Sequence, residues 1–180
     1  MSRKLSADRD VVILPHLIDR ARAGEPSAIA ELYSRYATSL FQTAYRITGA
    51  RSDAEDVVHD LFVGLPGALK RYEDHGQLAA WLNRIVVRLA LVRLRSDRSH
   101  LATPLDEYPL LAADRADSRA DLNDLQRKIM ELPDTLRAVL VLNRVEGYAH
   151  EEIAALLNIS AAASRTRLSR AIEMLRRSLL

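Results

Sequence analysis

Apolar residues recur at spacings of three and four along most of the chain, and this helical periodicity constrains the fold more than any other feature. One run contains Ile29, Leu32 and Tyr36 and follows Pro26. Such spacing places apolar side chains on one face of an α-helix, and proline suits the first helical position. Strand-forming sequence is scarce, because only 5% of the 180 residues are aromatic and the helix formers Leu, Ala and Arg are the most frequent residues. The sequence therefore predicts an all-α fold.

A second and a third helix are predicted downstream. Ser52 and Glu55 have the spacing of a capping box, in which a serine hydroxyl and a glutamate side chain satisfy main-chain N–H groups at a helix start. That helix meets Pro66-Gly67, where we expect a kink or an end because proline lacks an N–H group. The next periodic run extends from Leu78 to Arg95. Its predicted buried stripe consists of Leu78, Leu82, Ile85, Leu89 and Val92.

The helical pattern is then interrupted by Pro104 and Pro109, which stand among Asp, Ser and Ala residues. Such a composition is typical of a linker. We therefore expect two small helical domains, at residues 1–95 and 119–180, joined by a flexible acidic linker at residues 96–118. Both domains have a size that can fold, and no internal repeat relates them.

Charge is sorted along the chain, although the net charge is only +2. Residues 84–98 contain five arginines and one aspartate, and residues 160–180 contain five arginines and one glutamate. Between them, residues 99–124 contain six acidic residues and two arginines. A basic cluster is most often a solvated surface, so charge alone gives only limited support to a polyanionic partner. Arg84, Arg88 and Arg95, however, share one helix face. The helix has no acidic residue before Asp97, whereas a face chosen only for solubility would more often mix acidic and basic residues.

The C-terminal domain has the pattern of a helix-turn-helix. Gly147 is placed to end one amphipathic helix, and the next, EEIAALL, is followed by Asn158-Ile159-Ser160. Asparagine tolerates the left-handed conformation of a tight turn, and Ser160 can cap the last helix. A recognition helix of this kind suits a DNA major groove, and a helical hairpin used for protein contact is the alternative. The predicted buried stripe of the last helix consists of Leu168, Ile172, Leu175 and Leu179.

Several protein classes are excluded or disfavoured by what the chain lacks. It has no cysteine, so disulfides, thiolate zinc sites and cysteine nucleophiles are ruled out. No Ser-His-Asp constellation or glycine-rich phosphate loop is evident, and we expect no catalytic residue, no cofactor and no enzyme. His59 has no second histidine near it, so no metal site is expected. No apolar run reaches the about 20 residues of a membrane span, and we expect a cytoplasmic protein.

Three stretches, taken in order, resemble the extracytoplasmic-function (ECF) group of bacterial sigma factors in the sigma-70 family. They read AIAELYSRYATSLFQTAYRITGARSDAEDVVHDLFVGL, then AAWLNRIVVRLALVRLR, then LPDTLRAVLVLNRVEGYAHEEIAALLNIS with SRTRLSRAIEMLRR. The resemblance implies a sigma factor that binds core RNA polymerase and directs promoter-specific transcription initiation. Residues 1–95 would bind polymerase and melt the minus-ten element, and residues 119–180 would bind the minus-thirty-five element.

The resemblance also implies roles for individual residues. An acidic helix would face the clamp helices of the largest catalytic subunit, through Asp53, Glu55, Asp56, His59 and Asp60. A loop that captures a flipped base and a cationic helix would hold the minus-ten element. This set is Arg71, Tyr72, Glu73, Asp74, His75, Gln77, Asn83, Arg84, Arg88 and Arg95. The minus-thirty-five set is Arg144, Ser160, Ser164, Arg165, Arg167 and Arg170.

Two departures from the family pattern concern the helix-turn-helix. Ala149 stands where a serine usually caps the first of its helices. Ser164 stands where the family has valine, and its position falls on the buried stripe. A hydroxyl there must find a main-chain partner or cost about 1–3 kcal/mol.

The implied partners are core RNA polymerase (clamp helices and flap), promoter DNA and an anti-sigma factor, without a small-molecule substrate or membrane insertion. Two other interpretations stay open. One is a sigma-like decoy that binds a regulator, which the arginine faces on both domains disfavour. The other is a stand-alone helix-turn-helix regulator, which gives the acidic helix no purpose.

Overall fold

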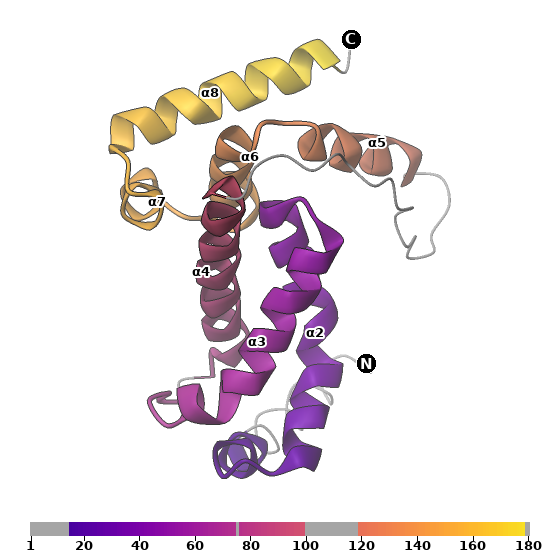
Figure 1. The fold of residues 1–180 in the computed structure, drawn as a ribbon, viewed down its shortest axis with the longest axis vertical. Coiled ribbons are helices and arrows are strands. Elements are labelled where there is room, and N and C mark those ends of the chain that lie inside the picture. Colours follow the sequence, from indigo (N-terminus) through magenta and orange to yellow (C-terminus); the bar gives the residue numbers. More distant parts are fainter. Residues whose placement is uncertain (1–14, 75, 100–118, 179–180) are drawn as a thin grey trace, which may run out of the picture. The chain divides into compact units, whose positions relative to one another are not determined.

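The computed structural model describes residues 15–74, 76–99 and 119–178. Every regular element in this part of the chain is a helix (Figure 1). The all-α prediction is therefore confirmed. None of the described helices combines the length and the apolar composition that crossing a membrane requires.

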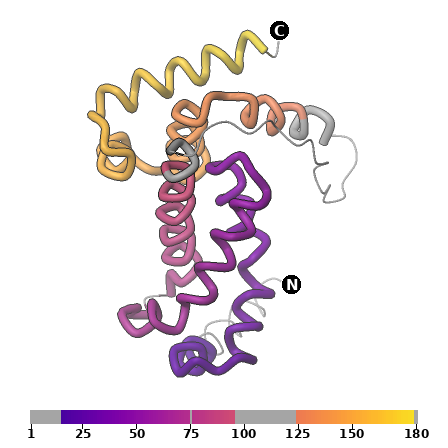
Figure 2. The backbone as a smooth tube through the Cα atoms, viewed as in Figure 1, coloured from indigo at the N-terminus to yellow at the C-terminus, as the bar shows by residue number. Residues whose placement is uncertain are grey.

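The chain forms two compact units, which we describe separately. The first contains the described residues up to Tyr45 together with Ala50–Ala90. The second contains Arg46–Gly49 and the described residues from Leu91 onward. Most of the predicted linker, residues 100–118, lies outside the described residues. Figure 2 traces the backbone through both units.

The first unit is built on three long helices. A short helix at residues 15–22 leads into α2 (Pro26–Thr48), α3 (Arg51–Leu69) and α4 (Leu78–Ser99). The proline that opens α2 occupies the predicted first position. The largest fully buried side chains of this unit are Leu17, Ile18, Leu32, Leu65, Leu69, Leu78, Leu82, Val86 and Val87.

The predicted capping box of α3 is wrong, and of the kink or end expected at Pro66-Gly67 the structure contradicts the end. The helix begins at Arg51, its N-cap residue is Ala50 and no side chain caps it, so Ser52 and Glu55 do not form a capping box. The Glu55 carboxylate instead accepts a hydrogen bond from Arg51 Nε at 2.7 Å. The helix also continues through Pro66 for three more residues. One missing N–H does not end it, because buried leucines on either side keep both halves packed on the core.

The buried face of α4 is wider than the predicted stripe. Leu78 and Leu82 are buried as predicted, whereas Ile85 and Leu89 are half-buried. Val92 is 60% exposed, so its predicted burial is wrong. The centre of the buried face follows every fourth residue from Leu78, whereas the later residues of the predicted stripe lie progressively nearer the edge of this face. The buried residues of α4 are Leu78, Leu82, Val86, Val87, Ala90, Leu91 and Leu94.

The second unit contains the predicted helix-turn-helix. After α5 (Arg119–Met130), α6 (Asp134–Leu140) continues into a π-helical turn, η1 (Val141–Val145). The pair α7 (His150–Leu157) and α8 (Ala161–Ser178) follows. Helix α8 packs against α5, α6 and α7. Its outer side therefore remains available to a partner.

Local sequence explains the turn between α7 and α8. Asn158 is left-handed, with φ 53° and ψ 53°, as predicted. Ser160 Oγ accepts a hydrogen bond from the Ala163 N–H at 3.0 Å, which confirms the predicted cap. Of the predicted stripe on α8, Leu168 and Leu175 are buried and Ile172 is half-buried. Leu179 lies outside the described residues, and Ser164 and Ala171 complete the buried face.

Candidate functional site

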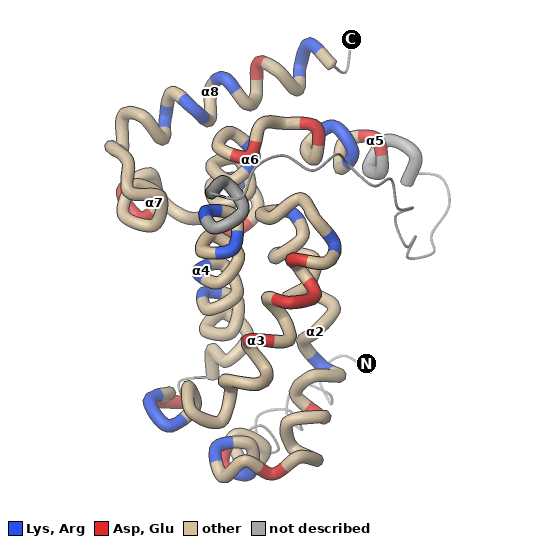
Figure 3. The backbone as a smooth tube through the Cα atoms, in the orientation of Figure 1, with Lys and Arg blue, Asp and Glu red and all other residues tan. Residues whose placement is uncertain are grey.

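The outward face of α3 is acidic, and Figure 3 colours the Asp and Glu residues red along the backbone of that helix. Glu55, Asp56, His59 and Asp60 are exposed, and Asp53 is half-buried. The structure therefore places all five predicted polymerase-binding residues on one helix and four of them on its surface. In the described part of the chain, no three His, Asp or Glu side chains are grouped closely enough to hold a metal ion.

Two exposed apolar side chains lie beside this acidic face, and the sequence reasoning missed both. Val63, one turn after His59 on α3, is 69% exposed, and Tyr33 on α2 is 50% exposed. The Tyr33 ring packs on Phe62 with ring centroids 4.9 Å apart. An apolar side chain on the polar side of an amphipathic helix was the signal that could have identified Val63.

A pocket opens where the loop after α3 meets the start of α4. Its cavity volume is about 280 Å³. The rings of Tyr72 and Trp81 form one side, with centroids 4.7 Å apart and ring planes at 45°. Five predicted minus-ten residues line the pocket, whereas Trp81 was not among them. The lining residues are Arg71, Tyr72, Glu73, Gln77, Ala80, Trp81 and Arg84.

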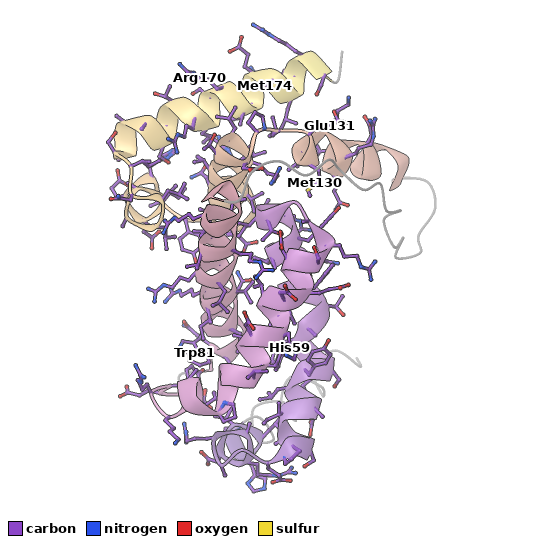
Figure 4. All side chains as sticks on the ribbon, viewed as in Figure 1. His59, Trp81, Met130, Glu131, Arg170 and Met174 are labelled. Carbon is purple, nitrogen blue, oxygen red and sulfur yellow. The ribbon has the colours of Figure 1, made fainter. Side chains whose placement is uncertain are left out.

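This pocket has the chemistry of a site for an unstacked base. Trp81, labelled in Figure 4, is a half-buried aromatic side chain at the start of α4. Arg71 and Arg84 are exposed at the pocket and carry charge that suits a phosphate backbone. Aromatic surface next to cationic side chains is how proteins hold single-stranded nucleic acid.

The other predicted minus-ten residues are distributed differently. Asn83 is half-buried and Arg88 is exposed, both on α4 within the first unit. Arg95 lies in the second unit, where its guanidinium donates to the Leu156 carbonyl. Arg84 and Arg88 belong to the first unit. His75 lies outside the described residues.

The loop that borders the pocket folds back on itself. Asp74 Oδ1 accepts hydrogen bonds from the Gly76 N–H at 2.9 Å and from the Tyr72 hydroxyl at 3.3 Å. Tyr72 is only 7% exposed. Burial, and then the charge and hydrogen bond of Asp74, raise the pKa of the Tyr72 hydroxyl, which keeps it a hydrogen-bond donor.

The outer side of α8 presents polar and cationic side chains. Arg165 and Arg170 are exposed, while Arg167 is half-buried; Figure 4 labels Arg170 on this helix. Arg165 lies 3.5 Å from Glu151 of α7, a weak surface pair that a phosphate can replace. Arg144 is exposed in η1. Four predicted arginines are thus at least partly accessible on the helix-turn-helix.

Ser164 cannot contact DNA directly in this arrangement, because it is fully buried. Its hydroxyl lies 2.9 Å from Nδ1 of His150, the first residue of α7. The expectation of a main-chain partner is therefore wrong, since a side chain of the neighbouring helix satisfies the hydroxyl. At the other departure, the Ala149 N–H donates to the Glu152 carboxylate at 2.8 Å, so half of a capping arrangement survives without serine.

Comparisons with known proteins agree with this architecture. The family described as Sigma-70 region 2 matches residues 32–100, and the family described as Sigma-70 region 4 matches residues 122–175. These two regions, on two helical units, define a protein of the sigma-70 class.

Individual relatives narrow the class. The chain is 30% identical to the ECF RNA polymerase sigma factor SigM of Mycobacterium tuberculosis, over 87% of this chain and 80% of SigM. It is 31% identical to the RNA polymerase sigma factor CarQ of Myxococcus xanthus, over 88% of this chain and 93% of CarQ. Among solved structures, CnrH in complex with the cytosolic domain of CnrY is 28% identical, with a TM-score of 0.51, over 91% of this chain and 94% of CnrH.

The chain belongs to the ECF sigma factors of the sigma-70 family. Sigma factors are non-catalytic subunits of transcription initiation. This protein therefore acts with core RNA polymerase on promoter DNA and directs promoter-specific initiation.

Proposed function

We propose that three surfaces divide the work of this sigma factor. The acidic face of α3 binds the clamp helices of core polymerase, the pocket and the arginines of α4 hold the melted minus-ten element, and α8 binds the minus-thirty-five element. The functional domains are residues 1–95 and 119–180, with residues 96–118 as the linker that lets each domain reach its own DNA element.

The pocket beside Trp81 is the observation that carries the proposal. A stand-alone repressor that reads duplex DNA through a helix-turn-helix has no use for a base-sized pocket on a different domain. A decoy that binds only a regulator has no use for the arginines at its rim. Capture of an unstacked base needs both features, because extrusion of the base must be offset by stacking and by phosphate neutralisation.

The polymerase-binding assignment is tested by charge reversal on α3. Asp56→Arg combined with Asp60→Arg should abolish co-purification with core polymerase, since reversal adds repulsion as well as removing attraction. The helical circular-dichroism signal should not change, because both side chains are exposed. Glu131→Arg with Glu173→Arg is the control with the same change in net charge. Equal loss of binding in both double variants would reject the assignment of this face.

The minus-ten assignment is tested by promoter opening. Arg84→Ala and Arg88→Ala should reduce permanganate reactivity of unpaired thymines more than they reduce binding to core polymerase. The fragment for this assay is one that the purified holoenzyme transcribes specifically. Equal losses of opening and of core binding would mean that these arginines serve the fold and not the DNA.

The minus-thirty-five assignment is tested on α8. Arg165, Arg167 and Arg170 project at different angles around the helix, so they should play different roles. At least one should discriminate bases by about 1–3 kcal/mol. The others should hold phosphates, and their loss should weaken binding to all sequences and flatten the salt dependence. Uniform losses for all three alanine variants, on matched and mismatched fragments, would indicate a non-specific anchor.

We also propose a cytoplasmic location and an anti-sigma partner. The relative CnrH has been solved with the cytosolic domain of CnrY, which supports a partner of that kind for this chain. Affinity capture of the full chain from cells should recover a protein that competes with core polymerase for it. If the recovered proteins include only polymerase subunits, control by synthesis alone becomes the explanation.

A further inference from the structure

We propose that Arg22 and Asp74 are positioning residues that hold the loop of the pocket in the shape that accepts a DNA base. This inference rests on the proposed function, because it assigns support to a pocket whose ligand is itself proposed. Neither residue is expected to contact DNA.

Arg22 reaches the loop from the short helix at residues 15–22. Its Nε donates to the Leu69 carbonyl at 3.0 Å, and one terminal nitrogen donates to the Tyr72 carbonyl at 3.1 Å. The other terminal nitrogen lies 2.5 Å from Asp19. The last carbonyls of a helix lack partners within that helix. The Leu69 carbonyl also accepts the Tyr72 N–H at 3.1 Å, so the guanidinium adds a second bond at the end of α3 and fixes where the chain leaves it.

Asp74 closes the same loop from within. Its carboxylate accepts the N–H of Gly76, which has a left-handed φ of +70°, and the hydroxyl of Tyr72. Tyr72 is thus held at its carbonyl by Arg22 and at its hydroxyl by Asp74.

These contacts assign different roles to residues that the family resemblance grouped together. Tyr72, with 7% of its surface exposed, has little free ring surface on which a base can stack. It supports the ring of Trp81 at a centroid distance of 4.7 Å. The Asp74 carboxylate already serves the loop. Base contact then falls to Trp81 and to the polar side chains at the rim, and the loop must be held for them to converge.

The experiment uses holoenzyme and a forked DNA whose non-template overhang carries a short random stretch. Wild-type holoenzyme selects sequences from this pool, and the selected overhang is then remade with a single abasic site at each position in turn. One abasic position should weaken binding roughly 5- to 150-fold, the range for loss of one stacked base. In Arg22→Ala and Asp74→Ala, the loss of DNA binding caused by an abasic site at that position should shrink to less than about twofold. The sequence preferences at the other positions of the overhang and the binding to core polymerase should be retained.

The matched control is Arg20→Ala, two residues from Arg22, because Arg20 bonds to Glu25 and Ser27, which are close to it in sequence and lie outside the loop. It should select like wild type. Asp74→Asn keeps an oxygen acceptor for the Gly76 N–H and should restore most of the abasic penalty. If Asp74→Ala does not fold, Tyr72→Phe removes the same hydroxyl bond and should lose the same single preference.

Three results overturn the inference. A full wild-type penalty in both alanine variants would show that the loop needs neither residue. A uniform loss at every position, or a loss of core binding, would show a general structural role. If wild type itself has no position at which an abasic site matters, base capture fails, and the positioning role fails with it.

Discussion

The hydrogen bond between His150 and Ser164 joins the two helices of the helix-turn-helix, and its loss should have a cost that depends on which partner is removed. His150→Ala leaves the Ser164 hydroxyl fully buried and removes its partner at 2.9 Å. A buried hydroxyl without its partner costs about 1–3 kcal/mol. Ser164→Ala leaves an imidazole that is half-buried and can turn to water, so about 0.5–1.5 kcal/mol is expected.

The double variant should therefore cost less than the sum of the two single variants, by about 1 kcal/mol. Amide hydrogen exchange of α7 and α8 in the full chain is the suitable assay, because it reports opening of these helices separately from the first unit. A coupling energy of about 1 kcal/mol corresponds to a change in exchange rate of roughly fivefold. Additivity within about 0.3 kcal/mol, or a smaller cost for His150→Ala than for Ser164→Ala, would refute the reasoning.

Three further predictions concern local stability. Gly64→Ala should raise the free energy of unfolding by about 1 kcal/mol in denaturant titrations, because nothing lies within 4 Å of a Cβ at this helical position. An unchanged denaturation midpoint would contradict this prediction. Ser160→Ala should lower protection of the first turn of α8 by about 1 kcal/mol, since the hydroxyl accepts the Ala163 N–H, and equal protection in both proteins would show that the cap contributes nothing. The hydrogen bond from Arg20 lowers the pKa of Glu25 from 4.5 to about 2. The stability that this pair contributes should therefore be complete above pH 4.5 and be lost as the pH falls through about 2. Carboxyl titration by NMR checks this, and a Glu25 midpoint near 4.5 would contradict it.

Helix positions and the turn could be predicted from the sequence because they depend on short-range chemistry. Pro26, Asn158 and Ser160 each determine a local backbone geometry, and each has the predicted role in the structure. The start of α3 could not be predicted in this way. A capping box and an uncapped start two residues earlier differ by less free energy than the packing of the helix supplies, so the local signal at Ser52 was overridden.

The site was predicted in part, for a related reason. Exposed charges follow from helical periodicity, and the acidic face of α3 and the exposed Arg84 and Arg88 are where that periodicity puts them. Contacts between distant segments leave no periodic signal. The bonds from Arg22 to the loop cross 47 and 50 residues, and the pairing of His150 with Ser164 joins two helices, so only the folded chain reveals them.

Trp81 is the chain's single tryptophan, and its place in the pocket gives the molecule an intrinsic optical reporter. Excitation that selects indole over phenol reports on this one side chain, because the second unit contains no tryptophan. Stacking of a nucleobase on an indole quenches its emission, so occupation of the pocket by single-stranded DNA can be followed in the isolated, unlabelled chain. Binding of the helix-turn-helix to duplex DNA should leave that emission unchanged, so one spectroscopic signal distinguishes the two DNA contacts of the isolated chain.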